Sequence, residues 1–304
     1  AALPQTPDLY VCCDPGGRYF PRGVEDLPIP TACYLVDVHL GTWRQQVAQF
    51  FDAVFIAQKD YLDRFRQAVG HGQVYWLPLA AAPDIYQQPV SARDFEVGFV
   101  GNLALAHRRT ARARRLRLIA ERFRTNDFYR AYTHAELSQV YSRSQIVFNT
   151  TIAGDVSLRL FEGATCSALM LTDSEANGLG ELFDMGREVV VYHDDADLLD
   201  KITYYLAHEV EREQIARAGQ ARVLAQHTYP HRAQQLLETL PLASWQRLAP
   251  LRRAGANERL RMRREVYIHL HLLDPVLDDA RASRYNPMQR AWSAFPALIR
   301  RLLI

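Results

Sequence analysis

The sequence has no apolar run of the roughly 20 residues that a membrane-spanning helix needs. Its start, AALPQTPDLY, lacks the charged and apolar regions of a signal peptide. We therefore expect a cytoplasmic protein, with contact at the inner face of a membrane as the most that the sequence allows.

Cysteine is scarce as well. The four cysteines, Cys12, Cys13, Cys33 and Cys166, show no CxxC spacing and no nearby histidine pair, so a zinc site is not expected. The neighbouring Cys12 and Cys13 cannot form an ordinary disulfide framework, and a reducing compartment fits the sequence best.

An excess of charge is also lacking. The formal net charge of +2 gives no case for nucleic acid or for an acidic partner. Lysine occurs only as Lys59 and Lys201, so arginine supplies nearly all the basic side chains, and arginine is the better bidentate partner for phosphate. At 304 residues the chain exceeds what one hydrophobic core usually serves, which predicts two domains.

Short apolar runs alternate with longer amphipathic segments, the pattern of parallel sheets covered by helices. Two sets of four strands are predicted, at 9–14, 31–37, 53–57 and 74–78 and at 95–101, 145–150, 168–173 and 188–193. The clearest helices are predicted at 110–124, 134–143, 157–166 and 195–208. Several strands end in Asp, Asn or Gly, and ligands of open α/β sheets bind at such carboxyl ends.

Residues 80–94 are rich in Pro and Ala, lack periodicity and separate the two strand sets, so we interpret them as a linker. The predicted domains are a Rossmann-like domain over 1–90, a second over 91–240 and a helical extension over 241–304 that packs back on the first. The first domain lacks a Gly-rich strand–turn–helix. It also has only four predicted strands, whereas a Rossmann half has about six. It is expected to be reduced or incomplete.

The stretch FVGNLALAHRRTARARR predicts a strand, a turn at Gly101–Asn102 and a helix with Arg108, Arg109 and Arg112 near its start. Cations there oppose the helix dipole at a cost of about 0.3–1 kcal/mol each when exposed. With a bound anion this cost becomes a gain, because the free N–H groups of the helix end and the arginines both face the anion. Phosphate binding and a solvated arginine face are equally supported.

The stretch FNTTIAGDVSLRLFEG predicts a strand that ends at Asn149, a polar loop with Asp155 and a helix from about Ser157. Arg159 and Glu162 are three positions apart, hence on one helix face. Arginine is the type that fixes a diphosphate, and a carboxylate is the type that accepts two hydroxyls of a ribose. A surface ion pair between them is the alternative, and the residues alone do not decide.

The string SLRLFEGATCSALMLTD, preceded by IVFNT and followed by a terminal H-T-Y-x-x-R segment, resembles the C-terminal half of CgeB-type glycosyltransferases. The resemblance covers residues 94–240. It implies an α/β fold of GT-B type, in which two Rossmann-like parallel-sheet domains face a cleft, the first binding the acceptor and the second a nucleotide-sugar donor. These enzymes are related to the retaining group 1 family.

The resemblance also implies roles. Glu162 is expected to hold the nucleotide ribose and Arg159 the diphosphate, with the Gly101–Asn102 turn lining the same cleft. The expected donor-binding set is Gly101, Asn102, Arg108, Arg109, Asn149, Asp155, Ser157, Arg159 and Glu162. One departure is that Asp155 stands seven positions before Glu162, one fewer than the second carboxylate of group 1 enzymes. Main-chain N–H groups of loop 154–157 could hold the sugar or diphosphate instead, so retention is an open point.

Asp37 and His39 follow a strand in the first half, a natural place for acceptor-side acid and base groups. A helix-capping Asp and a structural His are the alternatives. The catalytic candidates are thus Arg159, Asp37 and His39, of which the last two would supply the base of an inverting enzyme.

The stretch HDDAD contains Asp195 and Asp197 as a D-x-D, the manganese signature of another glycosyltransferase fold. It directly precedes a predicted helix, where acidic residues cap the helix and complement its dipole. No metal and no cofactor are therefore expected. His227, Tyr229 and Arg232 are predicted to fix the junction of the C-terminal helices.

The function predicted is metal-independent, retaining transfer of a sugar from a nucleoside-diphosphate sugar to an unidentified saccharide, lipid-linked or protein acceptor. A catalytically degenerate scaffold or sugar-nucleotide-binding protein is the alternative, and a nucleotide-sugar 2-epimerase is a further one. The base is expected to stack near 128–133. The tail over 287–304 is expected to pack on the first domain, with peripheral membrane contact as the alternative.

Overall fold

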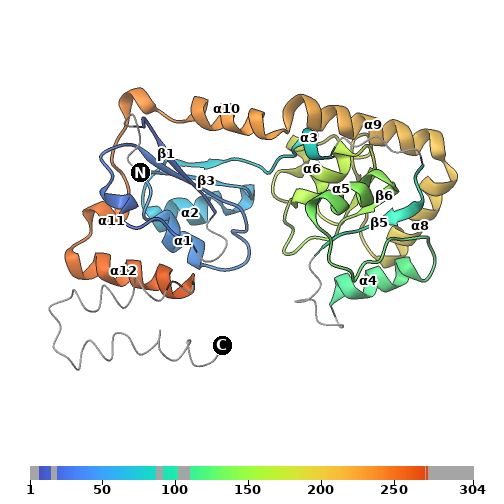
Figure 1. The fold of residues 1–304 in the computed structure, drawn as a ribbon, viewed down its shortest axis with the longest axis horizontal. Helices are drawn as coiled ribbons and strands as arrows, with labels where there is room; N and C mark the ends of the chain where they lie inside the picture. The colour runs from blue at the N-terminus through green and yellow to red at the C-terminus, as the bar shows by residue number, and fades with distance from the viewer. Residues whose placement is uncertain (1–6, 15–18, 87–91, 102–109, 271, 273–304) are drawn as a thin grey trace. The chain divides into compact units, whose positions relative to one another are not determined.

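The computed structural model describes residues 7–14, 19–86, 92–101, 110–270 and 272. The chain forms two compact units, each built on a sheet of its own (Figure 1). The first unit consists of Ala1–Ala57, Tyr61–Leu77 and Leu240–Ile304, and the second consists of Gln58–Asp60 and Pro78–Thr239.

The sheet of the first unit has four parallel strands in chain order: β1 (Tyr10–Cys13), β2 (Thr31–Leu35), β3 (Ala53–Ile56) and β4 (Val74–Trp76). All four residues of β3 are buried, because the run Ala-Val-Phe-Ile is apolar toward both faces of the sheet. The helices and turns are η1 (Val24–Asp26), α1 (Trp43–Ala48), α2 (Leu62–Val69), η3 (Leu242–Ser244), α11 (Pro250–Arg253) and α12 (Ala256–His269).

The C-terminal helix α12 completes the core of the first unit. Its residues Val266 and Tyr267 belong to the same buried cluster as Leu35 and Val54 of the sheet and Phe65 of α2. A segment more than 180 positions away from β3 is therefore part of this core.

A buried ion pair holds the start of that segment. Arg252 donates through Nε and Nη2 to the two carboxylate oxygens of Asp52, at 3.1 Å in each case. Asp52 is fully buried and also accepts from the Thr31 hydroxyl at 2.9 Å and from the Ala249 N–H at 3.0 Å. Because the buried carboxylate has a partner on each oxygen, α11 and α12 are fixed to the first sheet.

The sheet of the second unit is also parallel and ordered along the chain: β5 (Phe95–Gly98), β6 (Ser144–Phe148), β7 (Leu169–Thr172) and β8 (Val190–Val191). Its helices and turns are η2 (Lys59–Tyr61, shared with the first unit), α3 (Pro83–Tyr86), α4 (Ala111–Ala120), α5 (His134–Ser142), α6 (Leu158–Thr165), α7 (Leu179–Leu182), α8 (Asp195–Ala207), α9 (Glu209–Gln226) and α10 (Tyr229–Thr239).

Alternation along the strands divides the apolar side chains between the two faces of this sheet. One face packs in a single cluster with α4, α8 and α9, to which the strands contribute Val97, Ile146, Phe148, Leu169 and Leu171. The other face meets α6 closely. A Cβ on Gly163 would lie 2.5 Å from the Met170 Sδ, so this helix position has no room for a side chain.

β5 has neighbours on both edges. Val97 pairs with Ile146 of β6 and also forms an isolated parallel bridge with Thr125. The chain therefore runs from β5 through α4 to the bridge on one edge, and then through α5 back to β6 on the other edge. This reversal makes the carboxyl ends of β5 and β6 a topological switch point, where open α/β sheets bind ligands.

The predicted fold class is confirmed. All eight predicted strands are present, each within or one residue beyond its predicted bounds, and the four clearest predicted helices are α4, α5, α6 and α8. Part of the predicted linker over 80–94 is the helix α3, which belongs to the second unit; there Ser138 Oγ donates to the Ile85 carbonyl at 2.8 Å. The tail over 287–304 lies outside the described residues.

Within the described ranges, none of the helices combines the length and the apolar character that crossing a bilayer requires.

The junction between α9 and α10 depends on His227, which is 5% exposed. Its Nε2 lies 2.9 Å from the Leu182 carbonyl and its Nδ1 lies 2.8 Å from Arg232 Nη2. A carbonyl only accepts and a guanidinium only donates, so the ring is neutral with its proton on Nε2. Arg232 also donates to the Pro78 carbonyl at 2.8 Å, and Tyr229 donates its N–H to the Ala81 carbonyl at 3.2 Å. The structural interpretation of these three residues is confirmed.

Acidification should destabilise the second unit through His227. Burial lowers the pKa of this histidine from 6.5 to about 4, so the unfolded state binds the proton first. The neutral ring makes its full contribution to the free energy of unfolding above about pH 6.5, and this contribution is lost as the pH falls toward 4. The loss is at most about 1.4 kcal/mol per pH unit. His227→Gln keeps an N–H for Leu182 but does not titrate, so urea unfolding across this range should show a shallower loss.

His208→Gln, a change at an exposed histidine of the same unit, should keep the wild-type pH dependence. Identical slopes for the wild type and His227→Gln would show that His227 is not the titrating group.

Candidate functional site

Arg159, in the first turn of α6, joins the two strand ends at the switch point. Its Nε and Nη2 donate to the Val100 carbonyl after β5 at 3.1 and 2.9 Å, and its Nη1 donates to Asn149 Oδ1 after β6 at 2.6 Å. The guanidinium carbon lies 4.4 Å from the centre of the Phe99 ring. The predicted residues Arg159 and Asn149 are therefore in direct contact.

The charge of Arg159 is not neutralised by a carboxylate. Among the residues that the structure describes, no Asp or Glu oxygen lies within 4.0 Å of its guanidinium, although the side chain is half-buried. The surface ion pair with Glu162 that the spacing allowed is therefore wrong. A half-buried guanidinium whose acceptors are neutral is available to pair with an anion.

Gly101 leaves space for this guanidinium. A Cβ at this position would lie 2.9 Å from Arg159 Nη2 and 2.7 Å from Phe99 Cζ, closer than side chains pack. The positions of Phe99 and Arg159 thus explain why the predicted turn has glycine at position 101. The predicted site residues Asn102, Arg108 and Arg109 lie outside the described residues.

The loop before α6 is closed by its own side chains. Asp155 Oδ1 accepts from the Ile152 N–H, while Gly154 adopts a φ of 76°. Ser157 occupies the N-cap position, but its hydroxyl donates to Asn149 Oδ1 at 2.8 Å and does not cap the helix. The first N–H groups of α6 therefore lack a side-chain cap, which favours an anion at this helix end.

Glu162 lies one turn after Arg159, 6% exposed. Its Oε1 accepts a hydrogen bond from the hydroxyl of Tyr86, at the end of α3. Burial raises the pKa of the Glu162 carboxyl, and the same burial together with this carboxyl raises the pKa of Tyr86. Tyr86 was not a predicted site residue, because nothing in its sequence surroundings points to a contact 76 positions away.

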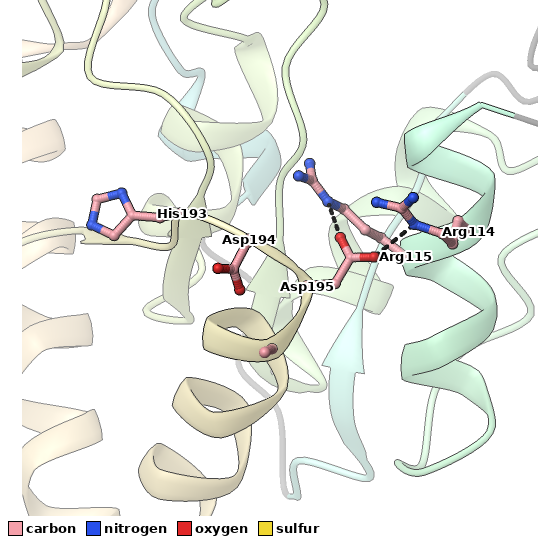
Figure 2. Close-up of a pocket in the computed structure, with 6 residues that line it drawn as sticks. Arg114, Arg115, His193, Asp194 and Asp195 are labelled. Carbon is pink, nitrogen blue, oxygen red and sulfur yellow. Dashed lines mark hydrogen bonds and ion pairs between the residues drawn. The ribbon is translucent and has the colours of Figure 1, made fainter.

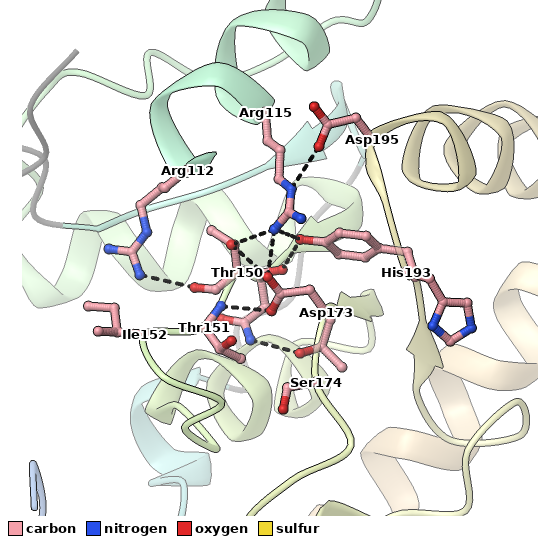
Figure 3. Close-up of polar contacts among 12 residues, drawn as sticks. Arg112, Arg115, Thr150, Thr151, Ile152, Asp173, Ser174, His193 and Asp195 are labelled. Atoms are coloured by element: carbon pink, nitrogen blue, oxygen red, sulfur yellow. Dashed lines mark hydrogen bonds and ion pairs between the residues drawn. The ribbon is translucent and has the colours of Figure 1, made fainter. Parts of the chain in front are cut away.

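Two arginines on α4 reach the loop after β6 (Figure 3). Arg112 Nη2 donates to the Thr150 carbonyl at 3.0 Å. Arg115 Nη1 donates to Asp173 Oδ2 at 2.6 Å and to the Thr150 hydroxyl at 3.1 Å, and its Nε donates to Asp195 Oδ1 at 3.0 Å. Arg115 thus cross-links α4 to the ends of β6 and β7 and to the start of α8.

The D-x-D motif lies beside a pocket of about 470 Å³ (Figure 2), lined by Arg114, Arg115, His193, Asp194, Asp195 and Ala196. Asp194 caps α8 by accepting from the Asp197 N–H at 2.9 Å, Asp195 pairs with Arg114 at 2.6 Å, and Asp197 pairs with Lys201 at 2.7 Å. The capping interpretation is confirmed. Within the described ranges no group of three or more His, Cys, Asp or Glu side chains is arranged to hold a metal ion.

Asp37 and His39 lie in the first unit, after β2. The Asp37 side chain is 50% exposed, 3.7 Å from Arg44 Nη2, and it caps no helix because α1 begins at Trp43. His39 Nδ1 is buried, and no described residue forms a hydrogen bond with it. Their predicted catalytic role remains a prediction.

The residue that organises this loop is Asp14, which ends the predicted strand over 9–14 but was not among the predicted site residues. Its Oδ2 accepts from Arg44 Nε at 2.6 Å and from the Val36 N–H at 2.9 Å. Phe128 is 3% exposed and packs edge-on against Phe99, and the stacking of a base near 128–133 remains a prediction.

The sequence was compared with known protein families and with known proteins. Residues 90–238 match the family described as "Glycosyl transferase-like". No curated protein matches the chain significantly.

Solved structures similar to the chain include that of HepE from Anabaena in complex with UDP and glucose, with 16% identity and a TM-score of 0.58 over 71% of this chain and 72% of that one. A UDP-forming α,α-trehalose-phosphate synthase from Burkholderia xenovorans is 12% identical, with a TM-score of 0.52 over 78% and 75%. A glycosyltransferase from Rickettsia africae is 11% identical, with a TM-score of 0.52 over 73% of each chain.

The structural likenesses establish the fold, which is that of the GT-B glycosyltransferases with two parallel α/β sheets. The domain that spans residues 90–238 is the part of the chain that matches the glycosyl transferase-like family. The switch point with Arg159 lies within this domain.

Arg115→Met should lower the free energy of unfolding by about 3 kcal/mol, the order expected when one partner of a buried ion pair is removed. Asp173, whose side chain is 12% exposed, would be left without its cation. Arg114→Met is the matched control, because the Arg114 side chain is 59% exposed and its pair with Asp195 should contribute less than about 1 kcal/mol. Urea unfolding measures both, and equally small losses would refute the cross-linking role of Arg115.

Proposed function

We propose that the chain transfers a sugar from a nucleoside-diphosphate sugar to an acceptor, as a member of the CgeB-like branch of the glycosyltransferases. The observation that carries this proposal is the guanidinium of Arg159 at the switch point, one helical turn from the buried Glu162 and with no carboxylate partner among the residues that the structure describes. Similarity to HepE, whose structures contain UDP and UDP-glucose, supports the donor class.

Arg159 and the start of α6 are suited to the diphosphate of the donor. The guanidinium supplies a fixed charge, and the uncapped N–H groups of α6 supply donors and the positive end of the helix dipole. Negative charge grows on the diphosphate as the sugar departs. Donors fixed in place before the reaction commonly contribute about 10²–10³ in rate each.

Glu162 is suited to the ribose of the donor. A carboxylate accepts hydrogen bonds from two neighbouring hydroxyl groups, and Glu162 follows Arg159 by one turn on the same helix face. Tyr86 already donates to Oε1, which fixes the orientation of the carboxyl group. A ribose at Glu162 and a diphosphate at Arg159 would thus follow the axis of α6.

The proposed reaction is metal-independent. Asp194 caps α8, while Asp195 and Asp197 are paired with arginine and lysine side chains. We therefore assign the neutralisation of the leaving group to Arg159 and the helix end. For a retaining course, the departing phosphate accepts the proton of the acceptor hydroxyl, and the donor half needs no further base. An inverting course would require Asp37 or His39.

Glu162→Gln should weaken the binding of the preferred nucleoside diphosphate by about 1.5–3 kcal/mol, the range for a hydrogen bond to a charged group. The amide keeps an oxygen for Tyr86, so thermal stability should change little. Calorimetry with UDP and GDP measures the affinity. Glu213→Gln is the matched control, because this glutamate is 43% exposed on α9 and should leave the affinity unchanged. Unchanged affinity in folded Glu162→Gln would remove Glu162 from the site.

Turnover of the donor should persist in excess EDTA, because the proposed cations are side chains and a helix end. The measurement is release of nucleoside diphosphate before and after chelation. Loss of turnover that manganese restores would assign a metal to the reaction and contradict this part of the proposal.

A further inference from the structure

The segment Gln58–Asp60 belongs to the second unit, although the residues before and after it in the chain belong to the first. The side chain of Gln58 is buried and forms two hydrogen bonds with the main chain of a single residue, Val156. Its Oε1 accepts from the Val156 N–H at 2.9 Å, and its Nε2 donates to the Val156 carbonyl at 3.2 Å. Val156 directly precedes Ser157, the N-cap residue of α6, so Gln58 holds the main chain where that helix begins.

Asp60 holds the same loop through Asn177. Asp60 donates its N–H to Asn177 Oδ1 at 3.2 Å, and its Oδ2 accepts from the Asn177 N–H at 3.0 Å. Asn177 is buried and has a φ of 55°, a conformation that asparagine adopts more readily than most residues. Its Nδ2 donates to the Gly154 carbonyl at 2.9 Å. The reciprocal pair with Asp60 thus fixes the amide that holds Gly154.

Other contacts of this loop come from the end of β7. Asp173 Oδ1 accepts from the Thr151 N–H at 2.8 Å (Figure 3), and Ser174 Oγ donates to the Gly154 carbonyl at 3.4 Å. These residues lie within the stretch 90–238 that matches the family, whereas Gln58 lies outside it, 98 positions away from Val156. The loop before α6 is therefore supported in part by a segment that the matched stretch does not contain.

The support from Gln58 determines where the free N–H groups of α6 lie. Val156 is 3% exposed, and a buried main-chain N–H and carbonyl both need partners, which the amide of Gln58 supplies. The next N–H groups, of residues 157–159, precede Leu160, whose N–H bonds to the Ser157 carbonyl at 3.2 Å. Their direction follows from the main chain at Val156, and a misplacement of about 1 Å can cost about 100-fold in rate.

We infer that Gln58 and Asp60 are positioning residues for sugar transfer, which act through the loop before α6 without touching the donor. This inference rests on the proposed function. The N–H groups at the start of α6 matter most as negative charge grows on the departing diphosphate. Holding the loop in one place therefore supports turnover more than it supports binding of the intact donor.

Gln58→Met tests the inference, because it removes both hydrogen bonds with little change in side-chain size. Turnover is measured on the full chain, well below its melting temperature, as release of UDP from UDP-glucose and of GDP from GDP-mannose. The kcat of the folded variant should fall roughly 10- to 100-fold with a much smaller change in KM for the donor. Hydrogen–deuterium exchange without nucleotide should be faster in peptides covering 152–160.

Asp60 allows a conservative comparison, because its side chain is exposed and accepts one hydrogen bond from Asn177. Asp60→Ala loses this acceptor and should lower kcat by roughly 2- to 10-fold, the size expected for one hydrogen bond. Asp60→Asn keeps an oxygen for the Asn177 N–H and should restore most of the kcat that Asp60→Ala loses.

Gln214→Met is the matched control, because it makes the same change at an exposed position of α9 and should keep the wild-type kcat and loop exchange. Two results would overturn the inference alone. One is a lowered melting temperature in Gln58→Met with an unchanged kcat of the folded protein, which would indicate a purely structural role, and the other is unchanged exchange of the loop. A wild-type protein that turns over no donor of a panel of UDP- and GDP-sugars would overturn the proposed function itself, and the inference with it.

Discussion

The bonds from Arg159 to the ends of β5 and β6 are the constraint on which the rest of the site depends. They bring together strand ends that are separated by about 50 positions in the chain, at the point where the strand order reverses. Asn149 is fully buried and serves as the hub: its Oδ1 accepts from Arg159 and Ser157, and its Nδ2 donates to Thr172 on β7. A buried amide with each group satisfied holds its neighbours in one arrangement.

This arrangement explains the residue types around it. Glycine fits at position 101 because a Cβ there would lie 2.7 Å from Phe99 Cζ and 2.9 Å from Arg159 Nη2. Ser157 does not cap α6 because its hydroxyl is used on Asn149, which leaves the helix end open to an anion. Three other helices of the second unit do have a side-chain cap: Thr110 caps α4, Thr133 caps α5 in a capping box with Glu136, and Asp194 caps α8.

The sequence predicted what depends on local patterns. Apolar runs located all eight strands, and the spacing of Arg159 and Glu162 placed both on the first turns of one helix. The sequence could not predict contacts between distant segments: Tyr86 on Glu162, Arg115 on Asp173, and Arg44 on Asp14. Each joins loops or helices whose proximity follows from the sheet order, which periodicity does not encode. The same limit explains Phe128, whose neighbours in the chain suggest an exposed loop while the fold buries it against Phe99.

The central claim is that the ends of β5 and β6 and the start of α6 bind a nucleoside diphosphate. Hydrogen–deuterium exchange of the main chain, with and without UDP or GDP, tests it most directly. The account predicts slower exchange in peptides covering 97–101 and 149–162 when the nucleotide is bound, with the strands of the first unit unaffected. Protection confined to peptides of the first unit, with 149–162 unchanged by a nucleotide that binds, would contradict it.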